Sequence, residues 1–265
     1  MLFSVKEGRV PVGTSSLDWA RFGSGPKTLV LLPGLSLRTV KGAGLGLAAM
    51  YRAFCKDCTV WVLDRKNEPE EGCTIRSLAA DTLAAMDALG IEKADFFGVS
   101  QGGMVAQEIA LARPDRVGRL VLAVTCGKTN PVLQSAVEGW LAFAQRDDWA
   151  GLVYDMMPRM YSEKYLKKYR LVLPVLARMG KPKDPVRFIR LAKACLTCDT
   201  ADRLPELACP VFVLGGGADR VVGDGAEQLA RTLGCKVKIY AGLGHAAYEE
   251  AADFNRQVLD FLKEN

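Results

Sequence analysis

Six short apolar runs constrain the fold of this chain more than any other feature of its sequence. Each is rich in Val, Leu, Ile or Phe and nearly continuously apolar, which is typical of a strand buried on both faces of a parallel sheet. Helical patterns separate the runs, and two of these patterns stop at Gly90 and Pro114, residue types that commonly end helices. The alternation predicts an α/β fold with a mostly parallel central sheet flanked by helices. The runs are residues 28–33, 59–64, 95–100, 120–125, 211–216 and 236–241.

The alternation changes character in two places. Residues 2–22 are more polar and irregular, and we expect one or two antiparallel strands there, at the edge of the sheet. Between Gly127 and Leu204 the pattern is helical without strand runs, and the alternation resumes at Cys209. We therefore predict a core domain of residues 1–126 and 205–265, with residues 127–204 inserted as a helical cap.

Composition places the chain among ordinary globular proteins. It has 265 residues, 49% of them hydrophobic and 25% charged, which suits one large α/β domain with an insertion. A net charge of +5 is too small to indicate nucleic-acid binding by itself. The N-terminus lacks a signal-peptide pattern, and no stretch approaches the roughly 20 apolar residues that cross a bilayer. We expect a cytoplasmic protein that binds neither nucleic acid nor membrane.

Eight cysteines include two C-x-x-C pairs, Cys55/Cys58 and Cys195/Cys198. Paired C-x-x-C motifs can form a structural zinc site, but the two pairs are usually only about 15–20 residues apart. Here they are separated by half the chain, and the cytosol disfavours disulfides. We expect reduced and mostly buried thiols, with zinc binding or a redox role as the alternative.

The most specific motif is G-x-S-x-G at Gly98-Val99-Ser100-Gln101-Gly102. It follows the apolar run of residues 95–100 and opens a helical pattern, which is the context of a nucleophile elbow. Glycines at the flanking positions permit a turn too tight for larger residues. The turn lifts the serine hydroxyl clear of the sheet and points a helix N-terminus at it. We predict that Ser100 is a nucleophile; a plain tight turn is the alternative.

A serine hydroxyl needs a base to take its proton, and histidine is the usual one. The chain has one, His245, in a glycine-rich segment after the last apolar run. Such a position at the carboxyl end of a strand is where α/β sheets bind ligands. A lone histidine is more often structural, but this location favours a catalytic role.

The third member of such a triad is a carboxylate that fixes the imidazole tautomer. Asp219 follows the run of residues 211–216 on a loop that begins Gly215-Gly216-Gly217. The order Ser, Asp, His along the chain is the one seen in this α/β fold rather than in the other serine-hydrolase folds. Asp224, on the same loop but farther from the strand, remains the alternative.

An oxyanion hole needs two backbone donors. Leu35 follows the run of residues 28–33 in the segment Pro33-Gly34-Leu35, and Gln101 follows the nucleophile. We predict that the backbone N–H groups of Leu35 and Gln101 form the hole.

With these motifs, nearly the whole chain resembles an α/β-hydrolase-fold esterase with a helical cap. The resemblance implies no metal and no organic cofactor, and a small-molecule acyl substrate that is hydrolysed through an acyl-serine. The sequence departs from the family at Pro33-Gly34, where relatives commonly have His-Gly. It departs again after Asp64-Arg65, where many relatives have a glycine-rich turn and this chain has the longer KNEPEEGC, a segment that we expect to shape the entrance.

The predicted cap is rich in large apolar and in basic side chains. The apolar ones could line an acyl pocket or only pack the cap onto the core: Trp140, Trp149, Met156, Met157, Met160, Tyr161, Tyr165 and Tyr169. The basic ones favour a solvated helix face over a site for an acidic substrate: Lys164, Lys167, Lys168, Arg170, Arg178, Lys181, Lys183, Arg187, Arg190 and Lys193.

One fold hosts many reactions, so alternatives to a carboxylesterase stay open. Within serine hydrolysis they are proline iminopeptidase, thioesterase, lactonase and C–C bond hydrolase. An iminopeptidase needs an acidic group for the substrate amine, and Glu138, Asp147 and Asp148 are candidates. Outside catalysis, the alternatives are a ligand sensor with very slow turnover and a structural partner-binding protein.

Overall fold

The computed structural model describes residues 4–264, and its centre is one eight-stranded sheet. The strand order is β1-β2-β4-β3-β5-β6-β7-β8. The first two strands are antiparallel, as expected at the sheet edge, and all strands from β4 to β8 run parallel. The strands are β1 (Lys6–Val12), β2 (Ser15–Phe22), β3 (Lys27–Leu32), β4 (Cys58–Lys66), β5 (Ala94–Val99), β6 (Val117–Ala123), β7 (Val211–Gly216) and β8 (Lys236–Tyr240).

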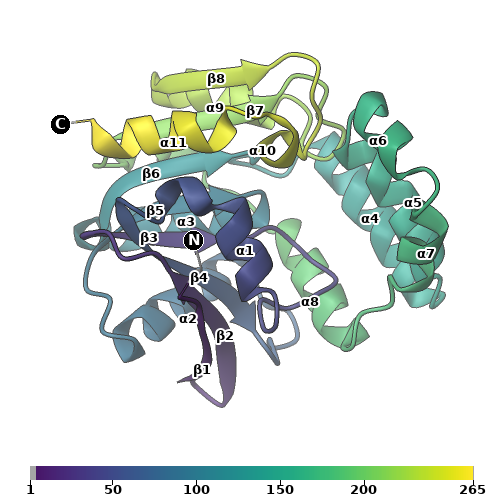
Figure 1. Cartoon of the computed structure of the whole chain (residues 1–265), viewed down its shortest axis with the longest axis horizontal. Helices are drawn as coiled ribbons and strands as arrows, with labels where there is room; N and C mark the ends of the chain where they lie inside the picture. Colours follow the sequence, from purple (N-terminus) through teal and green to yellow (C-terminus); the bar gives the residue numbers. More distant parts are fainter. Residues whose placement is uncertain (1–3, 265) are drawn as a thin grey trace.

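Helices cover both faces of this sheet, which confirms the predicted α/β architecture (Figure 1). One hydrophobic core lies under α2, α3 and α9, and the other lies under α1 and α11. The helices are α1 (Gly44–Met50), α2 (Ile75–Ala88), α3 (Gln101–Ala112), α4 (Pro131–Gln145), α5 (Trp149–Met160), α6 (Glu163–Tyr169), α7 (Leu173–Arg178), α8 (Pro185–Cys195), α9 (Gly225–Leu233), α10 (Ala247–Glu250) and α11 (Phe254–Lys263).

Strand β3 illustrates why the central runs are apolar at every position. Successive side chains of a strand point to opposite faces. Leu29 and Leu31 accordingly enter one core, while Val30 and Leu32 enter the other, and all four are fully buried. Both faces must therefore be apolar at once, and the run loses the alternation of a half-exposed strand.

The run of residues 236–241 does not follow this rule, and its expected burial on both faces is wrong. It forms β8, which pairs only with β7 among the described strands, and Lys236, Val237 and Lys238 are exposed. A strand at the edge of a sheet is often protected from pairing with other chains by lysines of this kind.

The segment between β6 and β7 contains α4 to α8, as the interrupted pattern predicts. In Figure 1 these helices stand beside the carboxyl ends of the central strands, with α4 to α7 grouped to one side and α8 nearer the core. The division into a core domain and a cap at residues 127 and 204 remains a prediction.

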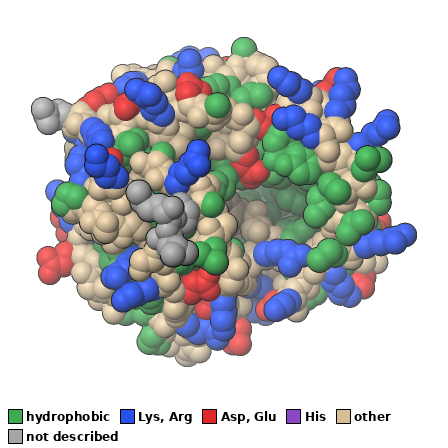
Figure 2. Space-filling model, in the orientation of Figure 1, with side chains coloured by type: hydrophobic (Ala, Val, Ile, Leu, Met, Phe, Trp, Pro, Cys, Tyr) green, Lys and Arg blue, Asp and Glu red, His purple; other side chains and the backbone are tan. Residues whose placement is uncertain are grey.

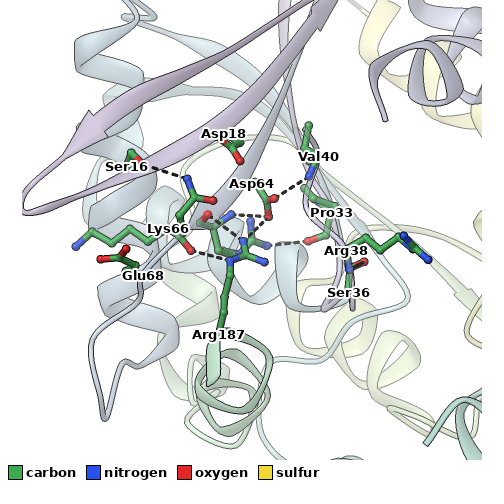
Figure 3. A network of polar contacts seen from close by, with 12 residues as sticks. Ser16, Asp18, Pro33, Ser36, Arg38, Val40, Asp64, Lys66, Glu68 and Arg187 are labelled. Carbon is green, nitrogen blue, oxygen red and sulfur yellow. Dashed lines mark hydrogen bonds and ion pairs between the residues drawn. The ribbon is translucent and has the colours of Figure 1, made fainter. Parts of the chain in front are cut away.

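A buried ion pair joins α8 to the end of β4 (Figure 3). Nη2 of Arg187 lies 2.9 Å from Oδ1 of Asp64, and its Nε donates to the carbonyl of Lys66. The other carboxylate oxygen of Asp64 accepts the backbone N–H of Val40, so the pair also holds the loop after β3. Arg187 thus corrects the expectation that the basic residues of the cap form a solvated face, because its side chain is only 7% exposed.

The predicted entrance segment after Asp64 also packs on α8. Strand β4 continues through Lys66, two residues beyond the apolar run, and Nη1 of Arg190 donates to the carbonyl of Pro69. Lys66 is buried and paired with Glu70 and Asp81, which explains how charged residues occupy a strand end.

The turn from β5 into α3 is closely packed against the neighbouring backbone. Ser100 has φ of 53° and ψ of −119°, a conformation that a residue with a side chain rarely adopts. A Cβ on Gly102 would lie 2.0 Å from the carbonyl oxygen of Leu32, and one on Gly98 would lie 2.6 Å from that of Gly102. Only glycine fits at either position, which explains why the motif has glycine on both sides of the serine.

We predict that Gly102→Ala lowers the free energy of unfolding by about 3 kcal/mol, because β3 and α3 must separate to admit the methyl group. Gly139→Ala is the matched control: a Cβ there meets no atom within 4 Å, and alanine in a helix should stabilise by about 0.5–1 kcal/mol. Urea unfolding of both variants measures the difference. Equal stabilities would contradict the close packing of β3 against the elbow.

We also predict that Arg187→Met destabilises the protein by about 3 kcal/mol, because Asp64 would keep a buried charge without its partner. Arg178→Met, at an exposed position of the same segment, should change stability by less than about 0.5 kcal/mol. In a double-mutant cycle, adding Asp64→Asn to Arg187→Met should restore part of the loss. Additive effects of the two substitutions would show that the pair is not coupled.

Candidate active site

Ser100 stands at the tip of the turn between β5 and α3, where its backbone is held from several sides. Its N–H donates to the carbonyl of Ala123 on β6, and its own carbonyl accepts the N–H of Gly103 and the hydroxyl of Thr125. These contacts hold the serine in the strained conformation described above, a type of strain that costs about 1–3 kcal/mol. The hydroxyl is thereby directed away from the sheet, into the space under the cap.

His245 reaches this hydroxyl from the loop between β8 and α10. Its Nε2 lies 2.8 Å from Oγ of Ser100, and its Nδ1 lies 2.8 Å from Oδ2 of Asp219. The imidazole is buried, with 4% of the residue exposed. The three residues predicted from the motifs are therefore brought together in one hydrogen-bonded chain, although they are up to 145 positions apart in sequence.

Asp219 is itself held in place by the backbone of its own loop. Its Oδ1 accepts the N–H groups of Val221 and Val222 at 2.7 and 2.9 Å, which leaves Oδ2 directed at the imidazole. A carboxylate on Nδ1 keeps the proton there, so that Nε2 faces the serine as an acceptor. The alternative, Asp224, is exposed and bonds to Gln228 on α9, away from His245.

The segment Pro33-Gly34-Leu35 passes directly beside the serine. A Cβ on Gly34 would lie 3.2 Å from Cβ of Ser100, so the backbone can approach this closely because residue 34 is glycine. Within residues 4–264, the N–H groups of Leu35 and Gln101 have no hydrogen-bond acceptor. Donors that bind a ligand are expected to be free in this way. Their predicted role in an oxyanion hole remains a prediction.

Arg65, at the end of β4, holds the segment Pro33-Gly34-Leu35 in place. Its Nη2 donates to the carbonyl of Pro33 at 2.7 Å. Arg65 is fully enclosed, and burial lowers the pKa of its guanidinium to about 10. Its Nε and Nη1 have no partner among the described residues, and neither has Oε1 of the buried Gln101. Polar groups therefore pack against the side of the loop that faces Arg65.

A small cavity of about 30 Å³ lies between the serine and the cap. Ser100 and His245 form its floor, and its other walls are apolar side chains of the core and of the cap helices α4 and α5. The apolar residues are Leu35, Met104, Leu133, Val137, Trp140, Met156, Met160 and Val221, with Cys195 and Tyr248 beside them.

The large side chains of the cap divide between the two roles that the sequence left open. Trp140, Met156 and Met160 line the cavity at the serine. Trp149 instead packs against Phe188 with ring centroids 5.7 Å apart. Tyr161, Tyr165 and Tyr169 stack on one another, with centroids 4.6 and 4.7 Å apart, and do not reach that cavity.

Several cavity residues were missed in the sequence. Leu133 and Val137 share one face of α4 with Trp140, which was already a pocket candidate, at spacings of four and three, so helical periodicity could have grouped them with it. Periodicity alone does not say that this face meets the serine. Met104 carried no signal beyond its apolar character, and the C-x-x-C spacing of Cys195 pointed to metal or redox chemistry rather than to this cavity.

Cys195 lies close enough to the serine to be considered as a second nucleophile. Burial raises the pKa of its thiol to about 12, and the side-chain amide of Gln101 contacts its sulfur at 3.1 Å. A thiol reacts as thiolate, and this one stays protonated at neutral pH. The other Cys of its C-x-x-C pair, Cys198, also has a pKa raised well above the ordinary value, through its contact with Cys126 and burial.

Among residues 4–264 the structure shows neither a cluster of metal ligands nor a membrane-spanning helix. No group of three or more His, Cys, Asp or Glu side chains gathers there as metal ligands would. None of its helices combines the length and the apolarity needed to cross a membrane.

Comparison with known proteins identifies the family of the chain. The model of the alpha/beta hydrolase family matches residues 29–257. A 2-hydroxy-6-oxononadienedioate/2-hydroxy-6-oxononatrienedioate hydrolase of Paraburkholderia xenovorans (strain LB400) is 30% identical over 97% of this chain and 93% of its own length. A putative carbamate hydrolase of Rhizobium rhizogenes (strain K84 / ATCC BAA-868) is 24% identical over 89% and 93%.

Among solved structures, the enol-lactonase from Burkholderia xenovorans LB400 superposes with a TM-score of 0.84. The alignment covers 97% of this chain and all of that chain, at 22% sequence identity, and so supports the fold. With the family model matched over most of its length, the chain belongs to the alpha/beta hydrolase family and is a hydrolase.

Proposed function

We propose that this protein is a serine hydrolase that cleaves an ester or a similar acyl bond through an acyl-serine on Ser100. The observation that carries the proposal is the hydrogen-bonded chain from Oγ of Ser100 through His245 to Asp219, with both distances at 2.8 Å. A structural serine or a structural histidine needs neither contact.

The chemistry follows from the acceptor at Nε2. His245 takes the hydroxyl proton of Ser100 as the oxygen attacks the substrate carbonyl. The carbonyl oxygen becomes an oxyanion, which the N–H groups of Leu35 and Gln101 stabilise; each such donor contributes about 2.7–4 kcal/mol. His245 then passes its proton to the leaving group, and the same residue activates the water that releases the acid.

The walls of the cavity indicate what the acyl group is like. Met104, Trp140, Met156 and Met160 offer apolar and adaptable surface, which favours an apolar acyl chain near the carbonyl. The volume of about 30 Å³ leaves room for little more than a water, so the cap helices α4 and α5 must move to admit substrate.

A second candidate is hydrolysis of a carbon–carbon bond. It is favoured by the relatives named as 2-hydroxy-6-oxononadienedioate/2-hydroxy-6-oxononatrienedioate hydrolases, which align with nearly the whole chain. The attack on a carbonyl and the acyl-serine are common to both reactions, and only the leaving group differs. Lactone or carbamate hydrolysis would use the same steps.

We expect Ser100→Ala to reduce hydrolysis of p-nitrophenyl butyrate by at least about 10⁴-fold, because the attacking oxygen is lost. Ser135→Ala, at an exposed position of α4, is the control and should keep the wild-type rate. Steady-state release of p-nitrophenol measures both. A serine-dependent burst without turnover would instead favour the slow sensor, and full activity of Ser100→Ala would exclude Ser100 as nucleophile. Parallel assays of a 2-hydroxy-6-oxo dienoate decide between ester and carbon–carbon cleavage.

The choice of acid is tested by a matched pair of substitutions on one loop. Asp219→Asn should lower kcat about 10³–10⁴-fold, because an amide at Oδ2 favours the wrong imidazole tautomer. Asp224→Asn should stay within about twofold of wild type, since its carboxylate contacts Gln228 and not the imidazole. Reversed effects would show that Asp224, and not Asp219, is the acid of the triad.

A further inference from the structure

A second cavity, of about 280 Å³, lies between the loop after β3 and the segment that enters α8. Its walls come from residues within 36–43 and 181–188, and Lys or Arg side chains dominate them. Arg38 and Lys41 contribute from the loop, and Lys181, Lys183 and Arg187 contribute from the other side. The face drawn in Figure 2 is hollowed between the core and the cap, with Lys and Arg side chains on its rim.

Only some of these charges are neutralised by neighbours. Arg187 is paired with Asp64, and Nζ of Lys181 lies 2.7 Å from Asp147. Within residues 4–264, Arg38, Lys41 and Lys183 have no carboxylate within ion-pair distance. The one acidic residue in the walls, Asp184, accepts the N–H of Arg187 at the start of α8. The cavity therefore keeps an excess of positive charge.

The basic cavity and the cavity at Ser100 are lined by different residues of the same two segments, the loop after β3 and α8. On the loop, Leu35 lines the serine cavity, and Ser36 and Leu37 line the basic one. On α8, Cys195 lines the first and Phe188 the second. At about 3.3–3.6 Å per extended residue the bent loop step spans at most about 7 Å, and at 1.5 Å per helical residue the α8 step spans about 10 Å.

We propose that the basic cavity is the subsite for an anionic group, a carboxylate or a phosphate, at the far end of the substrate. It rests on the proposed function, and it adds that the ideal substrate carries a negative charge roughly 7–10 Å from the carbonyl that Ser100 attacks. Concave clustering of like charges raises the local potential and attracts the opposite charge. Apolar walls next to the serine and cationic walls beyond it thus fit an apolar chain with a charged end.

The test compares two substrates of equal length. One is a series of mono-p-nitrophenyl esters of α,ω-dicarboxylic acids, which keep one free carboxylate, and the other is the series of their neutral methyl esters. The readout is the ratio of kcat/KM for the anionic ester to that for the neutral ester. We expect the wild-type ratio to exceed one at the chain length that matches the cavity, and to fall as salt is raised.

Lys41→Gln with Lys183→Gln removes two uncompensated charges and should lower this ratio about fivefold, as two exposed charge contacts would. Lys56→Gln, an exposed lysine outside both cavities, is the matched control and should leave the ratio as in wild type. A ratio that is the same in wild type and in the double variant overturns the subsite. If both substrates are nevertheless hydrolysed in a manner that requires Ser100, the proposed function stands without it.

A binding measurement tests the subsite independently of turnover. Ser100→Ala is titrated calorimetrically with suberate and, separately, with inorganic phosphate, alone and with the two lysine substitutions added. Binding of suberate or of phosphate that the substitutions abolish supports the subsite and identifies the anion. Absence of binding of both, or binding that survives the substitutions, overturns it. Absence of any hydrolysis that depends on Ser100 would contradict the proposed function alone.

Discussion

The strained turn at Ser100 is the constraint on which the rest of the site depends. A serine at φ of 53° persists only because β3, β6 and α3 are packed around it without room for adjustment. The carbonyl of Leu32 faces Gly102, and the N–H of Ser100 is bonded to β6. The same closeness of β3 brings Gly34 within contact of the serine. One packing condition therefore sets both the direction of the hydroxyl and the position of the loop that faces it.

Parallel strands explain why the remaining groups meet at this point. The carboxyl ends of β3, β5 and β7 lie on one edge of the sheet, and the loops that follow them carry Leu35, Ser100 and Asp219. His245 comes from the loop after β8, next to β7. Each residue is placed by its strand rather than by its neighbours in sequence. The three hydrogen-bonded side chains are thus positioned by the sheet, whereas helices α4 and α5 contribute walls of the cavity above them.

Most of the sheet and the three hydrogen-bonded residues could be predicted from the sequence because their signals are local. Strands buried on both faces are apolar throughout, and the elbow needs glycines at fixed positions. The exposure of β8 could not be predicted, because whether a strand is at an edge depends on pairing between distant segments. Arg187 is another such case: among the ten basic residues singled out in the predicted cap, only the fold identifies the one that meets Asp64.

The contact between Arg187 and Asp64 also connects α8 to the loop after β3. Asp64 accepts the N–H of Val40. The carbonyl of the neighbouring Arg65 accepts from the guanidinium of Arg187, and the guanidinium of Arg65 donates to the carbonyl of Pro33. A displacement of α8 would consequently reach the loop that carries Leu35. The helices α4 and α5, which line the serine cavity, are held to the core by hydrogen bonds instead, such as that from the N–H of Ala246 to the carbonyl of Met160. Because the cavity at Ser100 is too small for a substrate, we expect α4 and α5 to move and α8, which has the buried ion pair to β4, to stay with the core.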